Sequence, residues 1–128
     1  MPGPLRGLGQ VAMPAHDMDR AISFYRDTLG LSFLWSDGRL AFFQVGPTRL
    51  LIQKPESPAF DHPGSILYFD VDDIEEAVRE LKARGVVFQD EPHHVGDLGD
   101  VQVFMAFFPD PEGNLLALQA EKPLPASP

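Results

Sequence analysis

Short apolar runs and one helical face mark the first part of the chain. Leu8–Met13 is an apolar run of strand length. Asp17 then fits a helix N-cap, and Gly30 fits the position just after a helix. The apolar residues between them recur at the spacing of one helical face: Met18, Ala21, Ile22 and Tyr25. The pattern predicts a strand followed by a helix that ends near Leu29.

The second half of the chain repeats this pattern 56 residues later. Ile66–Val71 is again an apolar run, and Asp73 with Glu76 forms a capping box at the start of the next helical stretch. The apolar face of that stretch consists of Ile74, Ala77, Val78 and Leu81. Further on, Ala41-Phe42-Phe43 recurs as Ala106-Phe107-Phe108 at a spacing of 65 residues. The chain therefore contains an internal duplication, with nine additional residues in its second half.

Three more strands are expected after each helix. The first half has 31–36, 39–45 and 49–54, and Asp37-Gly38 predicts a tight hairpin turn between the first two. The expected strands of the second half are 86–89, 101–108 and 114–120. We expect the additional residues to form a long loop, Asp90–Asp100, at the place of that turn.

Each half is thus predicted to be a βαβββ module, which makes the fold α+β. The modules span about residues 8–54 and 65–120 of a single domain, 1–128, and a Pro-rich connector, 55–64, joins them. We expect the Pro-rich segment 121–128 to be a flexible tail.

Composition and charge exclude several classes of function. The net charge of −9 argues against binding to nucleic acid or to an anionic membrane. It is compatible with binding of a cationic small ligand, or with a role in solubility alone. The chain has no cysteine, so thiolate chemistry and cysteine zinc sites are excluded. No apolar run has the length of a membrane span, and the N-terminal residues lack an apolar signal core. We expect a cytoplasmic protein.

The paired modules resemble the vicinal oxygen chelate superfamily, which includes glyoxalase I, extradiol dioxygenases and bleomycin resistance proteins. The resemblance rests on motifs that cover most of residues 8–120: Asp17-Met18-Asp19-Arg20-Ala21, Phe24–Leu31, Val71–Ile74 and Phe108–Leu116. It implies two tandem βαβββ modules whose curled sheets form an open cleft. It also implies a homodimer and a small-molecule ligand.

Members of this family that use a divalent metal take one ligand from the first and the last strand of each module. The corresponding positions here are Gln10, Ile52, Ile66 and Ala117. Only the amide of Gln10 has an oxygen to offer, because the other three side chains are apolar. A one-residue slip at Ile52 would bring in Leu51 or Gln53 and would reverse the face of the sheet. We expect no metal ligand set and no cofactor, with a divalent metal as the less favoured alternative.

The candidate ligand-binding residues are those expected to face the cleft: Gln10, Ala12, Ile52, Ile66, Tyr68 and Ala117, together with His93 and His94 in the loop. Gln10 can bind ligand through its amide or be satisfied by neighbouring backbone, and Tyr68 can bind or simply pack. Adjacent histidines on extended chain point in opposite directions, so one metal ion would not take both. Trp35 and the phenylalanines alternate along the strands, and sequence does not decide which of them face the cleft.

The favoured hypothesis is a metal-free binder of an aromatic or mixed-polarity small molecule, of unknown specificity. One alternative is a resistance protein that sequesters an antibiotic as the bleomycin binders do. Another is a lyase, isomerase or dioxygenase of glyoxalase type that recruits a metal through Gln10 and the His93/His94 loop. Whether the protein is an enzyme stays open, and no catalytic residue is assigned.

Overall fold

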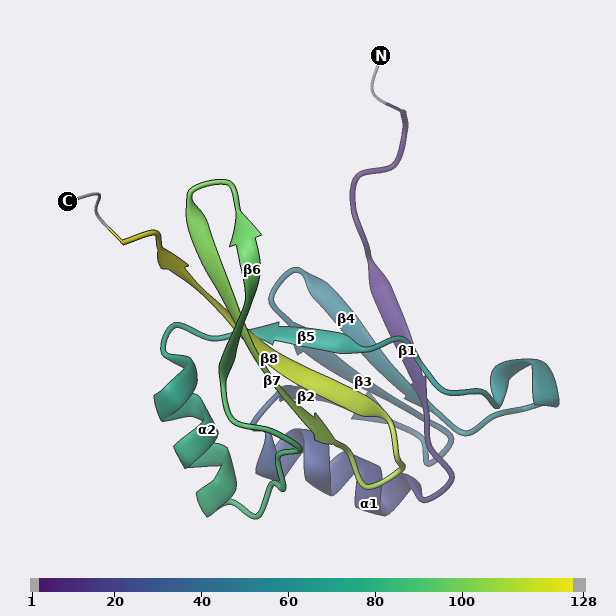
Figure 1. The fold of residues 1–128 in the computed structure, drawn as a ribbon. Coiled ribbons are helices and arrows are strands. Elements are labelled where there is room, and N and C mark those ends of the chain that lie inside the picture. The colour runs from purple at the N-terminus through teal and green to yellow at the C-terminus, as the bar shows by residue number, and fades with distance from the viewer. Residues whose placement is uncertain (1–2, 126–128) are drawn as a thin grey trace. The chain divides into compact units, whose positions relative to one another are not determined.

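The computed structural model describes residues 3–125, and its elements belong to two compact units. The boundary lies between Gly64 and Ser65, at the C-terminal end of the segment 55–64 that the sequence suggests as a connector. Each unit carries one four-stranded sheet and one main helix, which Figure 1 shows in purple to blue for the first unit and in green to yellow for the second.

The first unit has its strands in the order β1-β4-β3-β2. β1 runs parallel to β4, and the other neighbouring strands are antiparallel. Asp17 caps α1 by accepting a hydrogen bond from the Arg20 backbone N–H, as the sequence predicts. A π-helical turn continues α1 to the end of the apolar pattern. The elements are β1 (Gln10–Pro14), α1 (Met18–Ser23), η1 (Phe24–Thr28), β2 (Ser32–Ser36), β3 (Leu40–Val45), β4 (Thr48–Gln53) and η2 (Pro58–Phe60).

The second unit repeats this topology, with its strands in the order β5-β8-β7-β6. Its elements are β5 (Leu67–Asp70), α2 (Ile74–Ala83), β6 (His93–Leu98), β7 (Val101–Pro109) and β8 (Leu115–Pro123). The two matching strand orders confirm the α+β fold built from tandem βαβββ modules. β8 extends three residues into the segment expected to be a tail, and residues 126–128 of that segment lie outside the described residues.

The strand that follows α2 differs from the expectation. Residues 86–89 are not a strand; β6 begins only at His93, so the expected long loop is largely an edge strand. Residues 86–92 still run beside β7, but Phe107 donates its backbone N–H to the Asp90 carboxylate at 2.9 Å instead of to a strand partner. Pro92 has no N–H to donate, and regular pairing starts just after it. The additional residues therefore precede the hairpin, whose turn at Gly99-Asp100 is as tight as that of the first unit.

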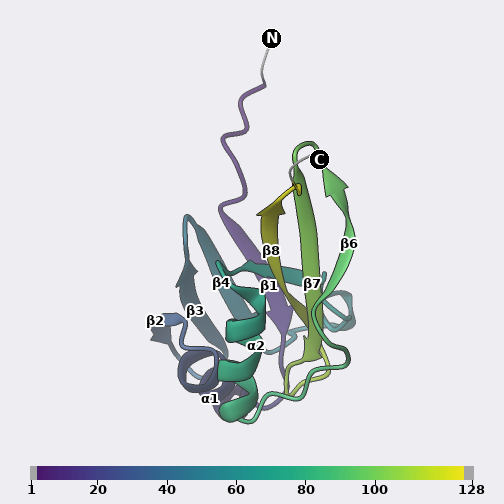
Figure 2. The ribbon, with the colours of Figure 1, turned by 60° about the vertical axis from the view of Figure 1, so that its left-hand side comes forward.

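One face of each sheet packs against its helix and forms the core of that unit. In the first unit Phe43 is fully buried and its ring centroid lies 6.0 Å from that of Tyr25 in the turn after α1. In the second unit Phe108 is fully buried 5.0 Å from Phe88, which follows α2. Within residues 3–125, the opposite face of each sheet carries no helix of its own unit, as Figures 1 and 2 show.

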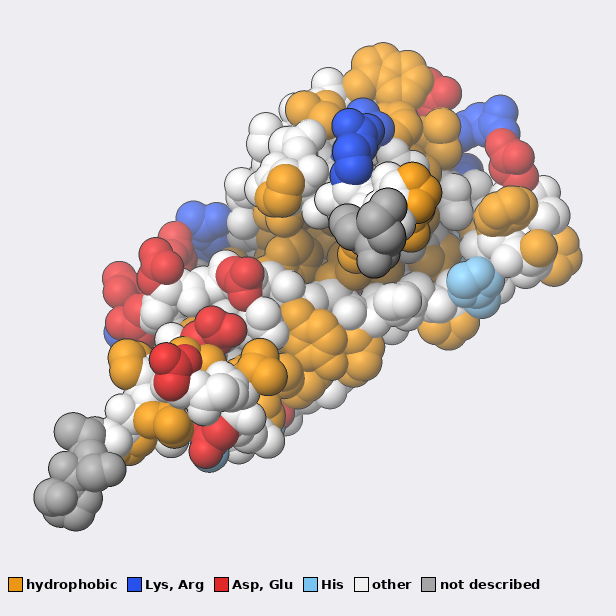
Figure 3. All heavy atoms as spheres, turned by 90° about the horizontal axis from the view of Figure 1, so that it is seen from above, with side chains coloured by type: hydrophobic (Ala, Val, Ile, Leu, Met, Phe, Trp, Pro, Cys, Tyr) orange, Lys and Arg blue, Asp and Glu red, His pale blue; other side chains and the backbone are white. Residues whose placement is uncertain are grey.

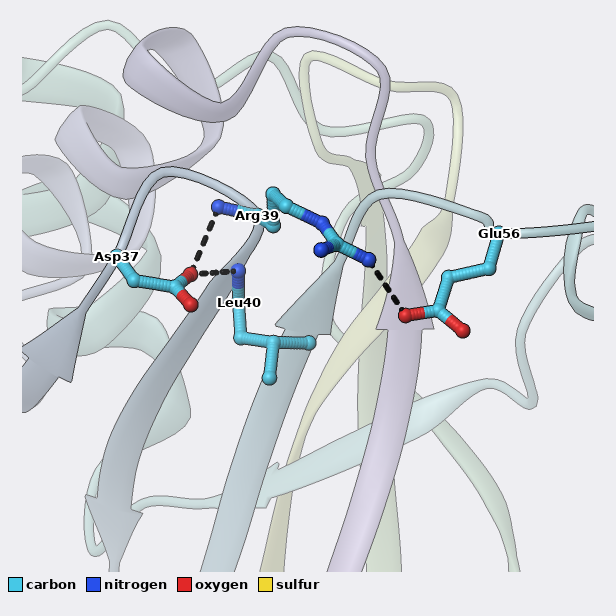
Figure 4. Close-up of polar contacts among 4 residues, drawn as sticks. All are labelled: Asp37, Arg39, Leu40 and Glu56. Atoms are coloured by element: carbon cyan, nitrogen blue, oxygen red, sulfur yellow. Dashed lines mark hydrogen bonds and ion pairs between the residues drawn. The ribbon is translucent and has the colours of Figure 1, made fainter.

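The turn between β2 and β3 is held by a carboxylate and tied to the connector (Figure 4). Asp37 Oδ1 accepts hydrogen bonds from the backbone N–H groups of Arg39 and Leu40, each at 2.9 Å. These two donors hold the pKa of the exposed Asp37 carboxyl below its ordinary value, because they stabilise its charged form. The Arg39 side chain turns away from Asp37 and donates to Glu56 at 2.6 Å. One turn thereby fixes the hairpin and anchors the start of the connector.

Candidate functional site

The register of the strands defines a helix-free face on the first sheet. Paired residues of neighbouring strands share a face, and the pairs that alternate with the buried Phe43–Leu50 pair point away from α1. This face carries several amides, one cation and no carboxylate. Its side chains are Gln10, Ala12, Pro14, Ser32, Trp35, Leu40, Phe42, Gln44, Arg49, Leu51 and Gln53.

Gln10 and Arg49 form a polar pair on this face. Gln10 is paired with Arg49 across β1 and β4, and Arg49 Nε donates to Gln10 Oε1 at 3.2 Å. The Arg49 guanidinium also lies over the Phe42 ring, 5.7 Å from its centroid. The sequence left two roles open for Gln10, binding a ligand or bonding to neighbouring backbone. In the structure its side-chain oxygen accepts a hydrogen bond from the Arg49 side chain on the helix-free face. The pair places a positive charge where sequence reasoning named only a neutral amide.

Aromatic rings continue the same face toward the edge of the sheet. Trp35 on β2 pairs with Phe42 on β3, and their ring centroids are 6.1 Å apart. Trp35 is 51% exposed at this edge strand, so its ring is accessible to a partner. Phe33 and Phe43 instead point to the helix side, with ring centroids 5.4 Å apart. The register therefore places Trp35 and Phe42 on the helix-free face and Phe33 and Phe43 on the helix side.

The expectation that Ile52 faces away from the helix is wrong. Ile52 pairs with Met13 and Ala41, and all three are buried in the core under α1. Leu51, one residue earlier, occupies the helix-free face beside Ala12. The candidate position on the last strand of the first module is therefore Leu51.

The second sheet has its own helix-free face, on which the expected residues Tyr68 and Ala117 lie side by side. Tyr68 on β5 pairs with Ala117 on β8, and Ala117 pairs with Phe107 on β7. The Tyr68 and Phe107 rings meet edge to face at 6.1 Å on either side of Ala117, which is fully buried. Ile66 lies just before β5 and is 40% exposed. Two residues further along the same strands, Gln119 donates to the Asp70 carboxylate at 2.7 Å.

The two adjacent histidines point to opposite faces, as expected for extended chain. His93 pairs with Met105 on the helix-free side, where its Nδ1 lies 2.9 Å from the Glu91 carbonyl oxygen and 3.4 Å from an Asp90 carboxylate oxygen. His94 contacts Phe104 on the helix side with tilted rings, and its Nε2 lies 2.8 Å from an Asp97 carboxylate oxygen. Only His93 shares a face with Tyr68 and Ala117, so His94 is not in a position to join them.

Charge is divided unevenly between the two units. The first unit has six basic and six acidic residues, whereas the second has four basic and thirteen acidic ones. The entire net charge of −9 thus belongs to the second unit, over which Figure 3 shows acidic side chains in red. Within residues 3–125, no helix has the length and apolar character needed to span a membrane.

The residues at the family's metal positions do not fit a divalent ion. With the register corrected, these positions hold Gln10, Leu51, Ile66 and Ala117, and only the first has a donor atom. The Gln10 side-chain oxygen already accepts a hydrogen bond from Arg49, and the positive charge of Arg49 opposes a cation at the same place. In the part of the chain that the structure describes, no three His, Asp or Glu side chains are grouped so that they could hold a metal ion.

Comparison with known proteins decides the family. The profile of the Glyoxalase/Bleomycin resistance protein/Dioxygenase superfamily matches residues 7–118. The chain belongs to this superfamily. Among curated proteins, this superfamily member is 26% identical over 124 residues to the uncharacterized protein YraH of Bacillus subtilis, covering 85% of this chain and 94% of YraH.

Solved structures include similar folds with different descriptions. TnmS3, an antibiotic binding protein from Streptomyces sp. CB03234, is 25% identical with a TM-score of 0.75, over 95% of this chain and 99% of that one. A lactoylglutathione lyase from Agrobacterium tumefaciens is 24% identical with a TM-score of 0.72, over 91% of this chain and 95% of that one. At this identity the lyase supports the fold alone.

Sequence reasoning did not single out Arg49. Arg49 begins the expected strand 49–54, and its positions 49, 51 and 53 share a face with Gln10 in the structure. The strand register is needed to tell that this face is the helix-free one. Side chains of a strand alternate between two faces, and the sequence does not say which of the two the helix covers.

Proposed function

We propose that this superfamily member binds an aromatic small molecule of mixed polarity on the helix-free faces of its sheets, without a metal ion of its own. The observation that carries the proposal is the composition of these faces. Rings such as Trp35 and Phe42 lie beside a few polar groups, as is typical of small-molecule sites. Among residues 3–125, only Gln10 of the family's four metal positions has an oxygen to offer, and no three His, Asp or Glu side chains are grouped so that they could hold a metal ion.

Metal content and thermal stability together test this function. Untagged protein is analysed for zinc, nickel, manganese and iron, and its unfolding is followed with and without chelator. Aromatic compounds are then screened by thermal shift, where a specific ligand raises the midpoint progressively with its concentration. We expect substoichiometric metal, no effect of chelator, and stabilisation by aromatic compounds.

A pair of variants on one edge strand makes the screen specific. Trp35→Ala removes the exposed ring of the helix-free face, and Leu34→Ala is the matched control, because Leu34 is 49% exposed in the bulge beside it. Stabilisation by ligand should be lost in the first variant and kept in the second. Stoichiometric metal that chelator removes, with a fall in midpoint, would contradict the proposal and favour the metalloenzyme of glyoxalase type.

Antibiotic sequestration is the second candidate function. It is favoured by the similarity to TnmS3, which is described as an antibiotic binding protein. The acidic second unit would attract a cationic antibiotic at low ionic strength. Bleomycin is the first compound to test, by thermal shift at low and at high salt. Stabilisation that weakens with salt supports this function, and its absence at both salt concentrations argues against it.

A further inference from the structure

Arg49 is an exposed cation without a carboxylate partner among residues 3–125. Several other cations of the molecule are paired: Arg26 with Asp27, Arg39 with Glu56, and Lys122 with Glu75. Within residues 3–125 the Arg49 side chain donates only through Nε, to an amide oxygen, so the two terminal nitrogens of its guanidinium are available. A planar fork of this kind matches a carboxylate, to which it donates two parallel hydrogen bonds.

Its neighbours hold this cation in place rather than neutralising it. Gln10 accepts from Nε, and the Phe42 ring lies under the guanidinium. The strands place only uncharged side chains beside it on the helix-free face, among them Ala12, Gln44 and Leu51. An anion bound there would meet no competing carboxylate on that face of the strands.

The aromatic pair lies next to the cation on the same face. Phe42 contacts both Arg49 and Trp35, so one ring links the charged group to the exposed indole. A flat ring can stack on this pair while a group attached to its rim reaches the guanidinium. The charge distribution also favours an anion at this site, because the first unit is neutral overall and does not repel an anion as the acidic second unit would.

We infer that the helix-free face of the first sheet selects a planar aromatic carboxylate, with Arg49 binding the carboxylate and Trp35 with Phe42 stacking on the ring. The inference rests on the proposed function and names the chemical class of its ligand. It assigns the specificity to Arg49, and it predicts preference for an anion in spite of the protein's net negative charge.

Three probes with the same ring and different charge test it: 2-naphthoate, 2-naphthamide and 2-naphthylmethylammonium. Trp35 is the single tryptophan of the chain, so quenching of its fluorescence reports on this face, and calorimetry supplies an independent affinity. We expect the carboxylate to bind at least tenfold more tightly than the amide, since a charge-assisted hydrogen bond is stronger than one between neutral groups. The ammonium should bind most weakly.

The variant Arg49→Met retains much of the side-chain length and removes the charge, and Arg79→Met on α2 makes the same change of net charge elsewhere. Arg49→Met should weaken the binding of the carboxylate probe roughly tenfold and leave the affinity for the amide probe unchanged. Arg79→Met should change neither affinity. Two results would overturn the inference and leave the proposed function standing. One is an equal loss of affinity for the carboxylate and the amide in Arg49→Met, and the other is tighter binding of the ammonium than of the carboxylate to the unchanged protein. Failure of all three probes to bind or to quench Trp35 at millimolar concentration would count against both.

Discussion

Asp37 shows how one side chain stabilises the first hairpin. Its carboxylate accepts from two successive backbone N–H groups that would otherwise be left without a partner at the turn. Gly38 takes a positive φ of 90° beside it, and its N–H donates to Ser36 Oγ. The turn therefore depends on the charge and the reach of one short acidic side chain.

The lowered pKa of Asp37 predicts a pH dependence of stability. A carboxyl whose pKa is lower in the folded than in the unfolded state stabilises the fold above its unfolded pKa, and this contribution is lost as the pH falls through the folded value. Asp37→Asn should therefore lower the unfolding midpoint slightly at neutral pH. The difference from wild type should shrink in the acid range below the ordinary carboxyl pKa.

Thermal unfolding of both proteins across that range measures the effect. Asp100→Asn is the control, since Asp100 is exposed in the equivalent turn of the second unit and its carboxylate accepts no hydrogen bond from the described residues. A difference between wild type and Asp37→Asn that stays constant with pH would refute the role given to the charge.

At the scale of elements, the turn between β7 and β8 depends on a buried network. Asp110 is 5% exposed and accepts from the backbone N–H groups of Glu112 and Asn114. Its second oxygen accepts from the Asn114 side-chain amide at 2.8 Å. The turn is therefore built around one carboxylate whose acceptor sites are used.

Asp110→Ala should destabilise the protein by about 2–3 kcal/mol, because it leaves several part-buried donors without acceptors. Asp110→Asn should have a smaller effect, since it keeps one acceptor oxygen. Denaturant unfolding measures both, and Asp100→Ala is the matched change in an exposed turn. If the free energies of unfolding of Asp110→Ala and of that control differed by less than about 0.5 kcal/mol, the network would contribute little to stability.

At the scale of the whole molecule, each sheet ends in strands with one unpaired edge. β1 and β2 are the outer strands of the first sheet, and β5 and β6 are those of the second. On β2, Leu34 and Trp35 are about half exposed. Exposed edges and apolar side chains of this kind favour association with a second chain.

We therefore expect a symmetric homodimer in solution. Light scattering during size-exclusion chromatography at micromolar concentration should give about twice the 14.2 kDa of one chain. Repeating the measurement at high salt separates an apolar interface from one held by ion pairs, because salt screens only the latter. A mass of one chain under both conditions would exclude the dimer at these concentrations.

The sequence by itself determined the duplication, the two capped helices and most of the strands. These features depend on local signals: Asp17 and Asp73 cap their helices in the structure as their positions predict. The sequence also predicted apolar side chains at three of the family's four metal positions, with Ile52 standing in for Leu51. Such conclusions need only residue types and spacing.

Only the tertiary structure decided the register and hence the faces. Phe43 pairs with Leu50 whereas Phe108 pairs with Leu116, so the spacing between the halves is 65 residues in β3 and β7 but 66 in β4 and β8. The extra residue lies in the turn around Asp110, and it moves the candidate position from Ile52 to Leu51. Strand side chains alternate with a period of two, so a shift of one residue reverses the face. The same pairing brought Arg49 beside Gln10, a contact between residues far apart in the chain that no local pattern specifies.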